Sequence, residues 1–451
     1  MRRALILMSI LGLAIGIFVW GAWRQSTLVN TNMYRTDQAA YMNYAKNMAQ
    51  TNFQYVGGRN RMPLYPGLMS FFYRQGMSDK DFFECGKNVG IAIGLLGVIV
   101  AFLLFRQVAK PMDALTGALV TMFTVFAYKS PFFQAEVLFY TISLVLFYLL
   151  LSLVEKPNIR TAAFAGLVGG LGHLTKASVL PAVLLAGLIT LLRGVLQLWQ
   201  HHHGRDTTAV NRRHSRFLLN YLCCAIVLLG CFLIVVFPYI RTSKKRYGKY
   251  FYNVNSTFYI WYDSWEEAKQ GTRAHDDRQG WPDMPEEQIP SFRKYIREHS
   301  FGEMVWRLTR GFCAISFNAL RSYGYVAFML LYGIMLLLLF YQNKDRVLPI
   351  LLYRVHPCVI LFIFGYFLGY TTLYAWYASI VSGNRFTLSL FLPSMLMIER
   401  FLSYTQSQNM SLVLFGKRIT ASRISPTVLL FLIVYVLTFF PYGISTMYGG
   451  N

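Results

Sequence analysis

The side chains of this chain that could do chemistry are a few charged residues set among long apolar runs. Asp37 opens a polar segment that continues to Arg59, Arg61 and two prolines, Pro63 and Pro66. A positioned carboxylate can remove a proton from a reacting hydroxyl group, and fixed cations can stabilise negative charge that develops on a leaving group. A segment of this kind in an otherwise apolar chain indicates polar chemistry at the surface of a membrane.

Apolar residues recur at helical spacing just after this aspartate. Between residues 39 and 50 they share one helical face, formed by Tyr41, Tyr44, Ala45 and Met48. The spacing predicts a helix that lies in the membrane interface. Aspartate is also favoured at the start of a helix, where the helix dipole suits a negative charge. On local sequence alone, capping is therefore the favoured role of Asp37, and lipid headgroups are alternative partners for Arg59 and Arg61.

The bulk composition assigns the chain to a class. Hydrophobic residues make up 55% of its 451 residues and charged residues 14%, whereas a soluble domain carries about 25% charged residues. Several apolar runs approach the roughly 20 residues that span a bilayer, and a backbone in lipid must satisfy its own hydrogen bonds. The sequence predicts an all-α polytopic membrane protein with about eleven transmembrane helices, at 4–23, 89–105, 113–128, 137–154, 161–174, 177–192, 217–239, 323–341, 358–373, 386–399 and 426–444.

Basic residues are unevenly distributed over the predicted loops. With the N-terminus in the cytosol, the inside segments are rich in Lys and Arg, whereas the short outside loops carry one each, Lys129, Lys176 and Arg385. This asymmetry follows the positive-inside rule. The first run follows Arg2 and Arg3 and has no small-residue cleavage site, so we interpret it as a retained anchor. The net charge of +23 thus reports topology and anionic lipid contact, and no nucleic-acid partner is expected.

Two predicted outside segments are long and divide the chain. They cover about 24–88 and about 240–322, and helical spacing within 302–321 predicts a helix on the membrane surface. We expect an N-terminal transmembrane module at 1–239 that holds the main candidate residues, an external loop region at 240–322 and C-terminal transmembrane helices at 323–451. Residues 201–216 are interpreted as a solvated basic loop, with a metal site at its three histidines as the less favoured alternative.

Other charged residues at membrane boundaries are predicted to face the same side as the polar segment. Glu136 precedes the fourth predicted span, Lys176 lies between the fifth and sixth, Arg241 ends the seventh and Arg385 precedes the tenth. An ionisable residue at such a boundary is costly to desolvate and is a functional candidate by default. The alternative is that each side chain extends to the lipid headgroups, which we hold open above all for Lys129.

The order of these motifs carries a family resemblance. Asp37-Gln-x-x-Tyr41 is followed by Arg61-x-Pro63-x-Tyr65-Pro66, by Ser130-Pro with Glu136, by Gly170 to Lys176, by Pro238-x-x-Arg241 and by Arg385-Phe386. Together they resemble the GT-C polyprenyl-phosphate-dependent glycosyltransferases, in the branch of protein O-mannosyltransferases and the bacterial transferases that add aminoarabinose to lipid A. Two residues depart from the pattern: Gln38 stands where members often carry glutamate, and His173 is not expected there.

The resemblance implies a reaction and a site. A sugar would move from a polyprenyl-phosphate donor to a lipid, glycan or protein acceptor on the extracytoplasmic face, with inversion at the anomeric carbon. Asp37 would be the catalytic base and Glu136 would orient a substrate. Contacts to the donor phosphate are expected from Arg59, Arg61, Lys176, Arg241 and Arg385, and contacts to the substrate from Tyr41, Tyr65, His173 and Tyr377.

The same resemblance bears on cofactors and location. No cofactor and no metal are expected, although Asp37 and Glu136 could together hold a divalent cation. Membrane lipids are expected partners beside the donor and the acceptor. The expected location is a bacterial inner membrane, with the site facing the periplasm or exterior.

Other classes of protein remain open. A transporter or lipid flippase also has many spans, but it would place polar groups near the bilayer midplane and show inverted repeats, which we do not find in the sequence. A non-catalytic subunit on the same fold would not need an intact set of acid and cations. A ligase or polymerase that joins lipid-linked glycans would differ only in its acceptor.

Overall fold

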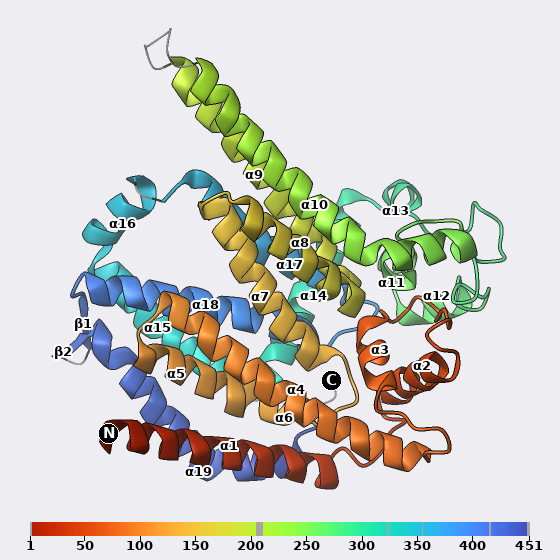
Figure 1. Cartoon of the computed structure of the whole chain (residues 1–451), viewed down its shortest axis with the longest axis horizontal. Coiled ribbons are helices and arrows are strands. Elements are labelled where there is room, and N and C mark those ends of the chain that lie inside the picture. The colour runs from red at the N-terminus through yellow and green to blue at the C-terminus, as the bar shows by residue number, and fades with distance from the viewer. Residues whose placement is uncertain (1, 204–210, 323, 354, 415, 449–451) are drawn as a thin grey trace.

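Long helices form the body of the molecule, and short helices gather at one end of it (Figure 1). The computed structural model describes residues 2–203, 211–322, 324–353, 355–414 and 416–448. The long helices are α1 (Arg2–Leu28), α4 (Asp79–Val108), α5 (Pro111–Thr121), α7 (Glu136–Glu155), α8 (Ile159–Thr175), α9 (Leu180–His203), α10 (Asn211–Tyr247), α14 (Phe301–Arg321), α15 (Tyr325–Gln342), α17 (Pro357–Tyr377), α18 (Asn384–Ser407) and α19 (Ile424–Thr446).

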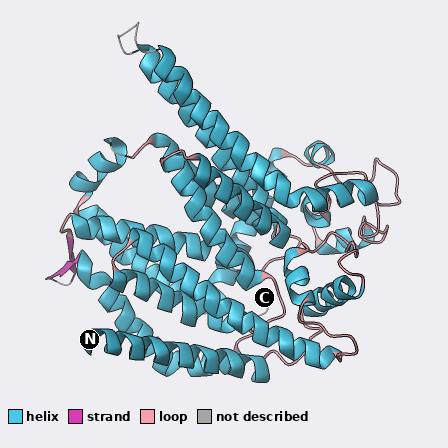
Figure 2. Cartoon of the chain, in the orientation of Figure 1, coloured by secondary structure: helices cyan, strands magenta, loops and turns pink. Residues whose placement is uncertain are grey.

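The shorter elements mark the two ends of the bundle. At the right of Figure 1 lie helices of the two long loop regions, and we call this the site end: α2 (Gln38–Gln50), α3 (Leu64–Ser70), α11 (Val254–Thr257), α12 (Trp265–Gln270) and α13 (Phe292–Glu298). At the left lie α16 (Lys344–Tyr353) and the antiparallel strands β1 (Ser411–Leu414) and β2 (Lys417–Thr420), and we call this the hairpin end. Helix accounts for most of the described chain (Figure 2).

Nine helices among the described residues are long and apolar enough to cross a membrane: Asp79–Val108, Pro111–Lys129, Glu136–Glu155, Ala177–Trp199, Leu218–Tyr247, Tyr325–Gln342, Pro357–Tyr377, Asn384–Ser407 and Ala421–Thr446. Each coincides with a predicted span, so the chain is a multi-pass, all-α integral membrane protein. The predicted count of eleven is not confirmed. The two other predicted spans form α1 and the 17-residue α8, which are not among the nine.

Helix α8 packs closely along α10 because its contact face is made of glycines. A Cβ added to Gly166 would lie 2.4 Å from the carbonyl oxygen of Leu228, and one added to Gly170 would lie 2.5 Å from Cβ of Val235. Small residues allow helix backbones to approach in membranes, where packing and not the hydrophobic effect drives association. This contact fixes the end of α8, which is followed at once by Lys176.

The span that starts with α5 is not a regular α-helix. It passes through a π-helical turn, η1 (Met122–Phe126), before α6 (Ala127–Lys129). A π turn holds one more residue than an α-helical turn and often occurs at functional sites. Every residue of this turn is buried, and the helix ends at Lys129, at the site end of the bundle.

Predictions for the loop regions had mixed outcomes. The helix expected after residue 39 is α2, which buries its apolar face, and the helix expected within 302–321 is α14, which begins with a capping box between Ser300 and Glu303. The basic loop expected at 201–216 is wrong at both ends, because α9 continues to His203 and α10 begins at Asn211. The remaining residues, 204–210, and the metal alternative for this loop lie outside what the structure describes.

Candidate functional site

Asp37 lies between two arginines that come from distant parts of the chain. Its Oδ1 is 2.6 Å from Nη2 of Arg61, and its Oδ2 is 3.4 Å from Nη1 of Arg385. The aspartate side chain keeps 40% of its surface exposed, against 17% for Arg61 and 23% for Arg385. The carboxylate is therefore reachable from outside while the cations behind it are largely covered.

The capping role favoured by local sequence is wrong. Asp37 does precede α2, but its side chain makes no capping hydrogen bond to the helix. The carboxylate forms ion pairs with the two arginines instead. Burial by itself would raise the pKa of Asp37, but the guanidinium groups of Arg61 and Arg385 outweigh it and lower the pKa below its ordinary value.

The backbone around Asp37 is held by buried amide side chains. Gln38 donates to Oδ1 of Asn30 at 2.8 Å and accepts both from Asn30 Nδ2 and from the backbone N–H of Phe133, at 2.9 Å each. Thr36 adopts a left-handed backbone with φ of 67°, and its hydroxyl accepts a hydrogen bond of 2.6 Å from Gln134. A non-glycine residue in this region stores strain that surrounding contacts must offset, which is common beside functional groups.

A second acid–base pair lies next to the first. Oε1 of Glu136 is 2.9 Å from Nζ of Lys176, and the glutamate side chain is only 5% exposed. Its other oxygen is buried with no hydrogen-bond partner among the described residues. Arg385 contacts Asp37 and lies close enough to Glu136 for its positive charge to act on that carboxylate. The backbone carbonyl of Arg385 accepts a hydrogen bond of 3.2 Å from Tyr140.

Lys129 is buried at the site and does not extend to lipid headgroups. We held open that this lysine extends to lipid headgroups, but it is 2% exposed and donates to Oδ1 of Asn384 at 3.0 Å. Its charge also acts on Glu136. The lysine and Asn384 therefore belong to the site, although neither was assigned a role in it from the sequence. The sequence contains one indication that Lys129 belongs to the site: Lys129 and Glu136 lie on either side of one short turn.

Two of the predicted substrate contacts form an aromatic wall beside the acids. The rings of Tyr41 and Tyr65 meet edge to face at 5.4 Å, and the Arg61 guanidinium lies 5.5 Å from the Tyr41 ring centre. Both tyrosines are almost fully buried, so they support Arg61 more than they offer free surface. Tyr377 lies near Phe386, and its hydroxyl bonds Asn255 at 3.1 Å.

Three predicted residues are not joined to these pairs. Arg59 donates to the carbonyl of Tyr239 and the hydroxyl of Thr242, and stacks 4.0 Å from the Tyr239 ring centre. His173 is buried, and its ring contacts include Tyr239. Arg241 is exposed on α10, and its side chain makes no hydrogen bond or ion pair with another described residue. Arg59 and His173 thus pack around Tyr239 and not against Asp37 or Glu136.

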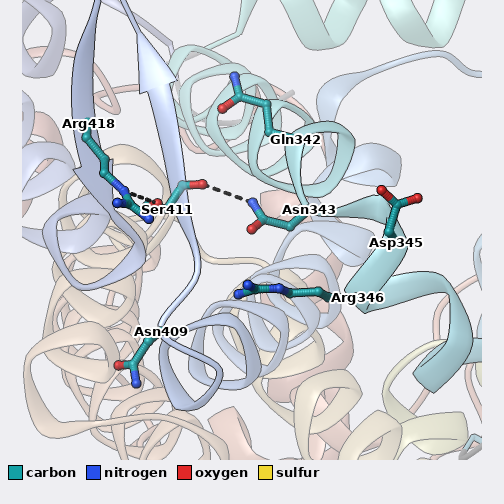
Figure 3. Close-up of a pocket in the computed structure, with 7 residues that line it drawn as sticks. All are labelled: Gln342, Asn343, Asp345, Arg346, Asn409, Ser411 and Arg418. Atoms are coloured by element: carbon teal, nitrogen blue, oxygen red, sulfur yellow. Dashed lines mark hydrogen bonds between the residues drawn. The ribbon is translucent and has the colours of Figure 1, made fainter.

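Pockets occur at both ends of the bundle. One of about 310 Å³ adjoins the site, lined by Asn384 with Asn318, Arg321, Ser322, Ser382, Gly383, Met447 and Tyr448. Another, of about 200 Å³, lies at the hairpin end between α15, α16 and β1 (Figure 3). There Asn343 and Arg418 both bond Ser411. The first pocket touches the site through Asn384, the hydrogen-bond partner of Lys129.

Comparison with known proteins gives a family for part of the chain. Residues 85–204 match the family model of dolichyl-phosphate-mannose-protein mannosyltransferases. This stretch runs from α4 to the end of α9 and contains Lys129, Glu136 and Lys176. The match confirms the predicted resemblance to the GT-C glycosyltransferases. No curated protein gives a significant sequence match.

The chain is also similar to solved structures of one archaeal enzyme, at low sequence identity. The chain is similar to the oligosaccharyltransferase AglB of Archaeoglobus fulgidus in complex with an inhibitory peptide and a dolichol-phosphate, with 13% identity and a TM-score of 0.47. The apo form of the Archaeoglobus fulgidus oligosaccharyltransferase gives 13% identity and a TM-score of 0.46. Both alignments cover 97% of this chain and 56% of the other, so the chain spans little more than half the length of these proteins.

Proposed function

We propose that this protein is a membrane glycosyltransferase that moves a sugar from a polyprenyl-phosphate donor to an acceptor hydroxyl, with Asp37 as the base. The observation that carries the proposal is the pairing of Asp37 with Arg61 and Arg385, next to Glu136 with Lys176, at one end of a bundle of membrane-spanning helices. The family match over 85–204 supports the same class of reaction. Basic residues in the opposite loops favour the extracytoplasmic face for this end.

The reaction would proceed by one displacement. The acceptor oxygen attacks the anomeric carbon while its proton passes to a carboxylate oxygen of Asp37. The bond from that carbon to the donor phosphate breaks, and its electron pair leaves with the lipid phosphate. Because attack and departure lie on opposite sides of the carbon, the configuration inverts.

The cations would act on the leaving phosphate. Negative charge grows on that group as the bond breaks, so fixed cations stabilise the transition state more than the bound substrate. Arg61, Arg385 and Lys176 are the candidates that the geometry supports best, because the two arginines contact Asp37 and Lys176 pairs with the neighbouring Glu136. Arg59 and Arg241 would serve only if the donor reaches toward α10.

The lowered pKa of Asp37 would be relieved when the donor binds. The Arg385 contact to Asp37 is long, at 3.4 Å, and a phosphate is a bidentate partner that arginine favours. As Arg385 turns to the phosphate, Asp37 loses a neighbouring positive charge and becomes a stronger base. Binding of the donor would thus switch on the group that activates the acceptor.

Glu136 would act differently from Asp37. It is buried and already paired with Lys176, so we assign it to orienting the lysine and a substrate hydroxyl. Each acid already holds a cationic side chain, and among the described residues no group of three or more His, Cys, Asp or Glu could hold a metal. We therefore propose a reaction carried out by side chains, without a divalent cation.

The decisive experiment is a product assay with purified protein. The protein would be incubated with a panel of polyprenyl-phosphate sugars and with lipid, glycan and peptide acceptors, and products would be identified by mass. Transfer that is lost in Asp37→Asn and kept in Asp79→Asn supports the proposal. Asp79 is a suitable control because it is exposed at the same end and pairs with Lys46 at 2.6 Å. Transport of an intact lipid-linked sugar without transfer would favour a flippase instead.

A further inference from the structure

The polar pocket of about 200 Å³ at the hairpin end lies at the opposite end of the bundle from Asp37 (Figures 1 and 3). Three membrane-spanning helices place this pocket at the boundary of the bilayer. Helix α15 ends at Gln342, α18 ends shortly before Asn409, and the hairpin that carries Ser411 and Arg418 leads into the span of α19. Lipid headgroups occupy this level of a membrane. None of the residues that line the pocket takes part in the function proposed above.

Two arginines line this pocket, and the protein itself does not neutralise their charges. Arg346 comes from α16 and Arg418 from β2, and Figure 3 shows Arg346 extending toward the hairpin. The one acid of the lining, Asp345, forms no ion pair with either arginine, and neither does any other acid among the described residues. The side chain of Arg346 and the Nη groups of Arg418 also have no hydrogen-bond partner in the described part of the chain. Across 343–353 and 409–423 the sequence has one acid, Asp345, and five basic residues: Lys344, Arg346, Lys417, Arg418 and Arg423.

Hydrogen bonds hold the frame of the pocket in place. Arg418 Nε donates to Oγ of Ser411 at 2.7 Å, and Nδ2 of Asn343 donates to the Ser411 carbonyl at 2.9 Å. Gln342 exchanges two hydrogen bonds with the backbone of Val413, at 3.1 and 2.7 Å. These bonds join the end of α15 to β1. A ligand that enters the pocket therefore meets groups that are already positioned, which lowers the entropy lost on binding.

The polar groups of the pocket suit a phosphodiester with a hydroxyl-bearing substituent. Guanidinium groups bind phosphate oxygens through paired, charge-assisted hydrogen bonds. The amides of Asn343 and Asn409 can donate to hydroxyl groups beside the phosphate or accept from them. A ligand that also carries an ammonium group would place a positive charge close to both arginines, and like charges repel. The lining therefore favours an anionic head over a zwitterionic one.

An exposed apolar stripe on α15 leads to the pocket. Leu330, Ile334, Leu337 and Tyr341 follow one another at spacings of three or four residues, and each has more than half of its surface exposed. This spacing places the four side chains on one face of the helix. Tyr341 directly precedes Gln342 of the pocket. Acyl chains of a lipid can pack along this stripe while its phosphate lies in the pocket, a contact that a soluble phosphate cannot make.

We propose that this pocket binds the phosphate of an anionic glycerophospholipid of the cytosolic leaflet. Arg346 and Arg418 hold the phosphate, the neighbouring amides hold the hydroxyl groups of the head, and the acyl chains lie along α15. Anionic lipids are enriched in the cytosolic leaflet, which is the side that the basic loops assign to this end. The site is separate from the glycosyl transfer proposed for the opposite end and does not depend on it.

The test measures bound lipid on the full-length protein. Protein freed of lipid in an uncharged detergent is mixed with phosphatidylglycerol or with phosphatidylcholine of the same acyl chains, and bound lipid is counted by native mass spectrometry. We expect phosphatidylglycerol to bind about tenfold more tightly, the effect of one charge-assisted contact. Its binding should also raise the thermal unfolding temperature. Inorganic phosphate at the same concentration should raise that temperature less, because it has no acyl chains to bury along α15.

Matched variants separate this pocket from general attraction of anionic lipid to a basic surface. Arg346→Gln and Arg418→Gln should each weaken binding of phosphatidylglycerol about tenfold, and Asp345→Asn should strengthen it, because it removes the one negative charge of the lining. Arg423→Gln removes a positive charge near the hairpin but outside the lining, so it should bind the lipid as the wild-type protein does.

Three outcomes would overturn the proposal. Equal affinity of the wild-type protein for the two lipids would do so without any variant. An equal loss of affinity in Arg423→Gln would show that only the overall charge of this end attracts the lipid. An equal rise in unfolding temperature with inorganic phosphate would assign the pocket to a soluble anion instead.

Discussion

Oδ1 of Asp37 lies 2.6 Å from Nη2 of Arg61, which follows it in the chain beyond α2, and α2 itself is left without a side-chain cap. The local pattern and the tertiary contact thus compete for one carboxylate, and the tertiary contact prevails. A half-buried carboxylate is stabilised more by a guanidinium group than by a helix terminus. The guanidinium carries a full unit charge and donates directional hydrogen bonds, whereas the helix terminus carries only a partial charge.

The first prediction concerns the base. Asp37→Asn keeps the size of the side chain but removes its basicity, so kcat should fall by about 10²–10⁴-fold. The thermal unfolding temperature should change little, because the side chain is 40% exposed. Kinetics and unfolding are compared with Asp79→Asn. Full activity of Asp37→Asn would exclude this residue as the base.

The second prediction concerns the buried pair of Glu136 and Lys176. Lys176→Met leaves a buried carboxylate without its partner, which costs about 3–5 kcal/mol. The double change with Glu136→Gln should recover much of that stability, because no charge is then left unpaired. Use of the lipid-phosphate donor should stay impaired in the double variant. Denaturation curves and the KM for donor distinguish the two roles, and recovery of both properties would leave the pair a purely structural role.

The third prediction is the pH dependence set by Asp37. Arg61 and Arg385 lower the pKa of this carboxyl, so the base stays ionised below the ordinary aspartate pKa of about 3.9. Any stability from this pairing is present above the unfolded-state pKa and is lost as pH falls through the folded-state pKa. Arg61→Gln should move the acid limb of the kcat/KM profile to higher pH. Arg74→Gln, at an exposed arginine, is the control, and an unmoved limb would show that Arg61 does not act on the base.

The fourth prediction concerns Gln38, which stands where the resembled family often has glutamate. Its amide donates to Oδ1 of Asn30, and a carboxylate at the same place has no proton to donate. Gln38→Glu should therefore destabilise the protein by about 1–3 kcal/mol, the cost of leaving buried polar groups unsatisfied. Chemical denaturation measures this loss. Unchanged stability together with raised activity would show that a second acid is tolerated and useful here.

The fifth prediction concerns a charged network in the external loop region. Asp263 accepts from His299 at 2.7 Å and from Arg307 at 2.8 Å. Burial alone would lower the pKa of His299, but hydrogen bonds to the Tyr295 carbonyl and to Asp263 raise it overall. The network's contribution is therefore complete below the ordinary histidine pKa of about 6.5 and is lost as pH rises through the raised value. Protease resistance of residues 240–322 should fall over that range, and His299→Gln should remove the pH dependence.

Sequence patterns were sufficient for the parts of this fold that depend on period and composition. The nine spans and the helix after Asp37 follow from apolar runs and helical spacing, which local physics largely determines. The grouping of Asp37, Glu136, Lys176 and Arg385 followed from counting which loops share a face. The side of the membrane on which each residue lies depends only on how many membrane spans separate it from the others.

What could not be predicted depends on distances between side chains. Arg59 and Arg61 are two residues apart, yet one bonds the Tyr239 carbonyl and the other pairs with Asp37. Arg59 has a left-handed backbone with φ of 52°, so its side chain points in a different direction from that of Arg61. The residue type does not predict this conformation. Lys129 was undervalued for a similar reason, since its burial is set by how α6 meets α18 and not by its own neighbours.

The π-helical turn at Met122–Phe126 sets the rotational phase of everything that follows it in the span. Successive residues of an α-helix differ by about 100° around the axis, so the extra residue in this turn rotates Lys129 by that angle relative to an uninterrupted helix. Lys129 meets Asn384 only in the rotated phase. A single deletion within the turn would direct the ammonium group away from Asn384 without changing any residue of the site.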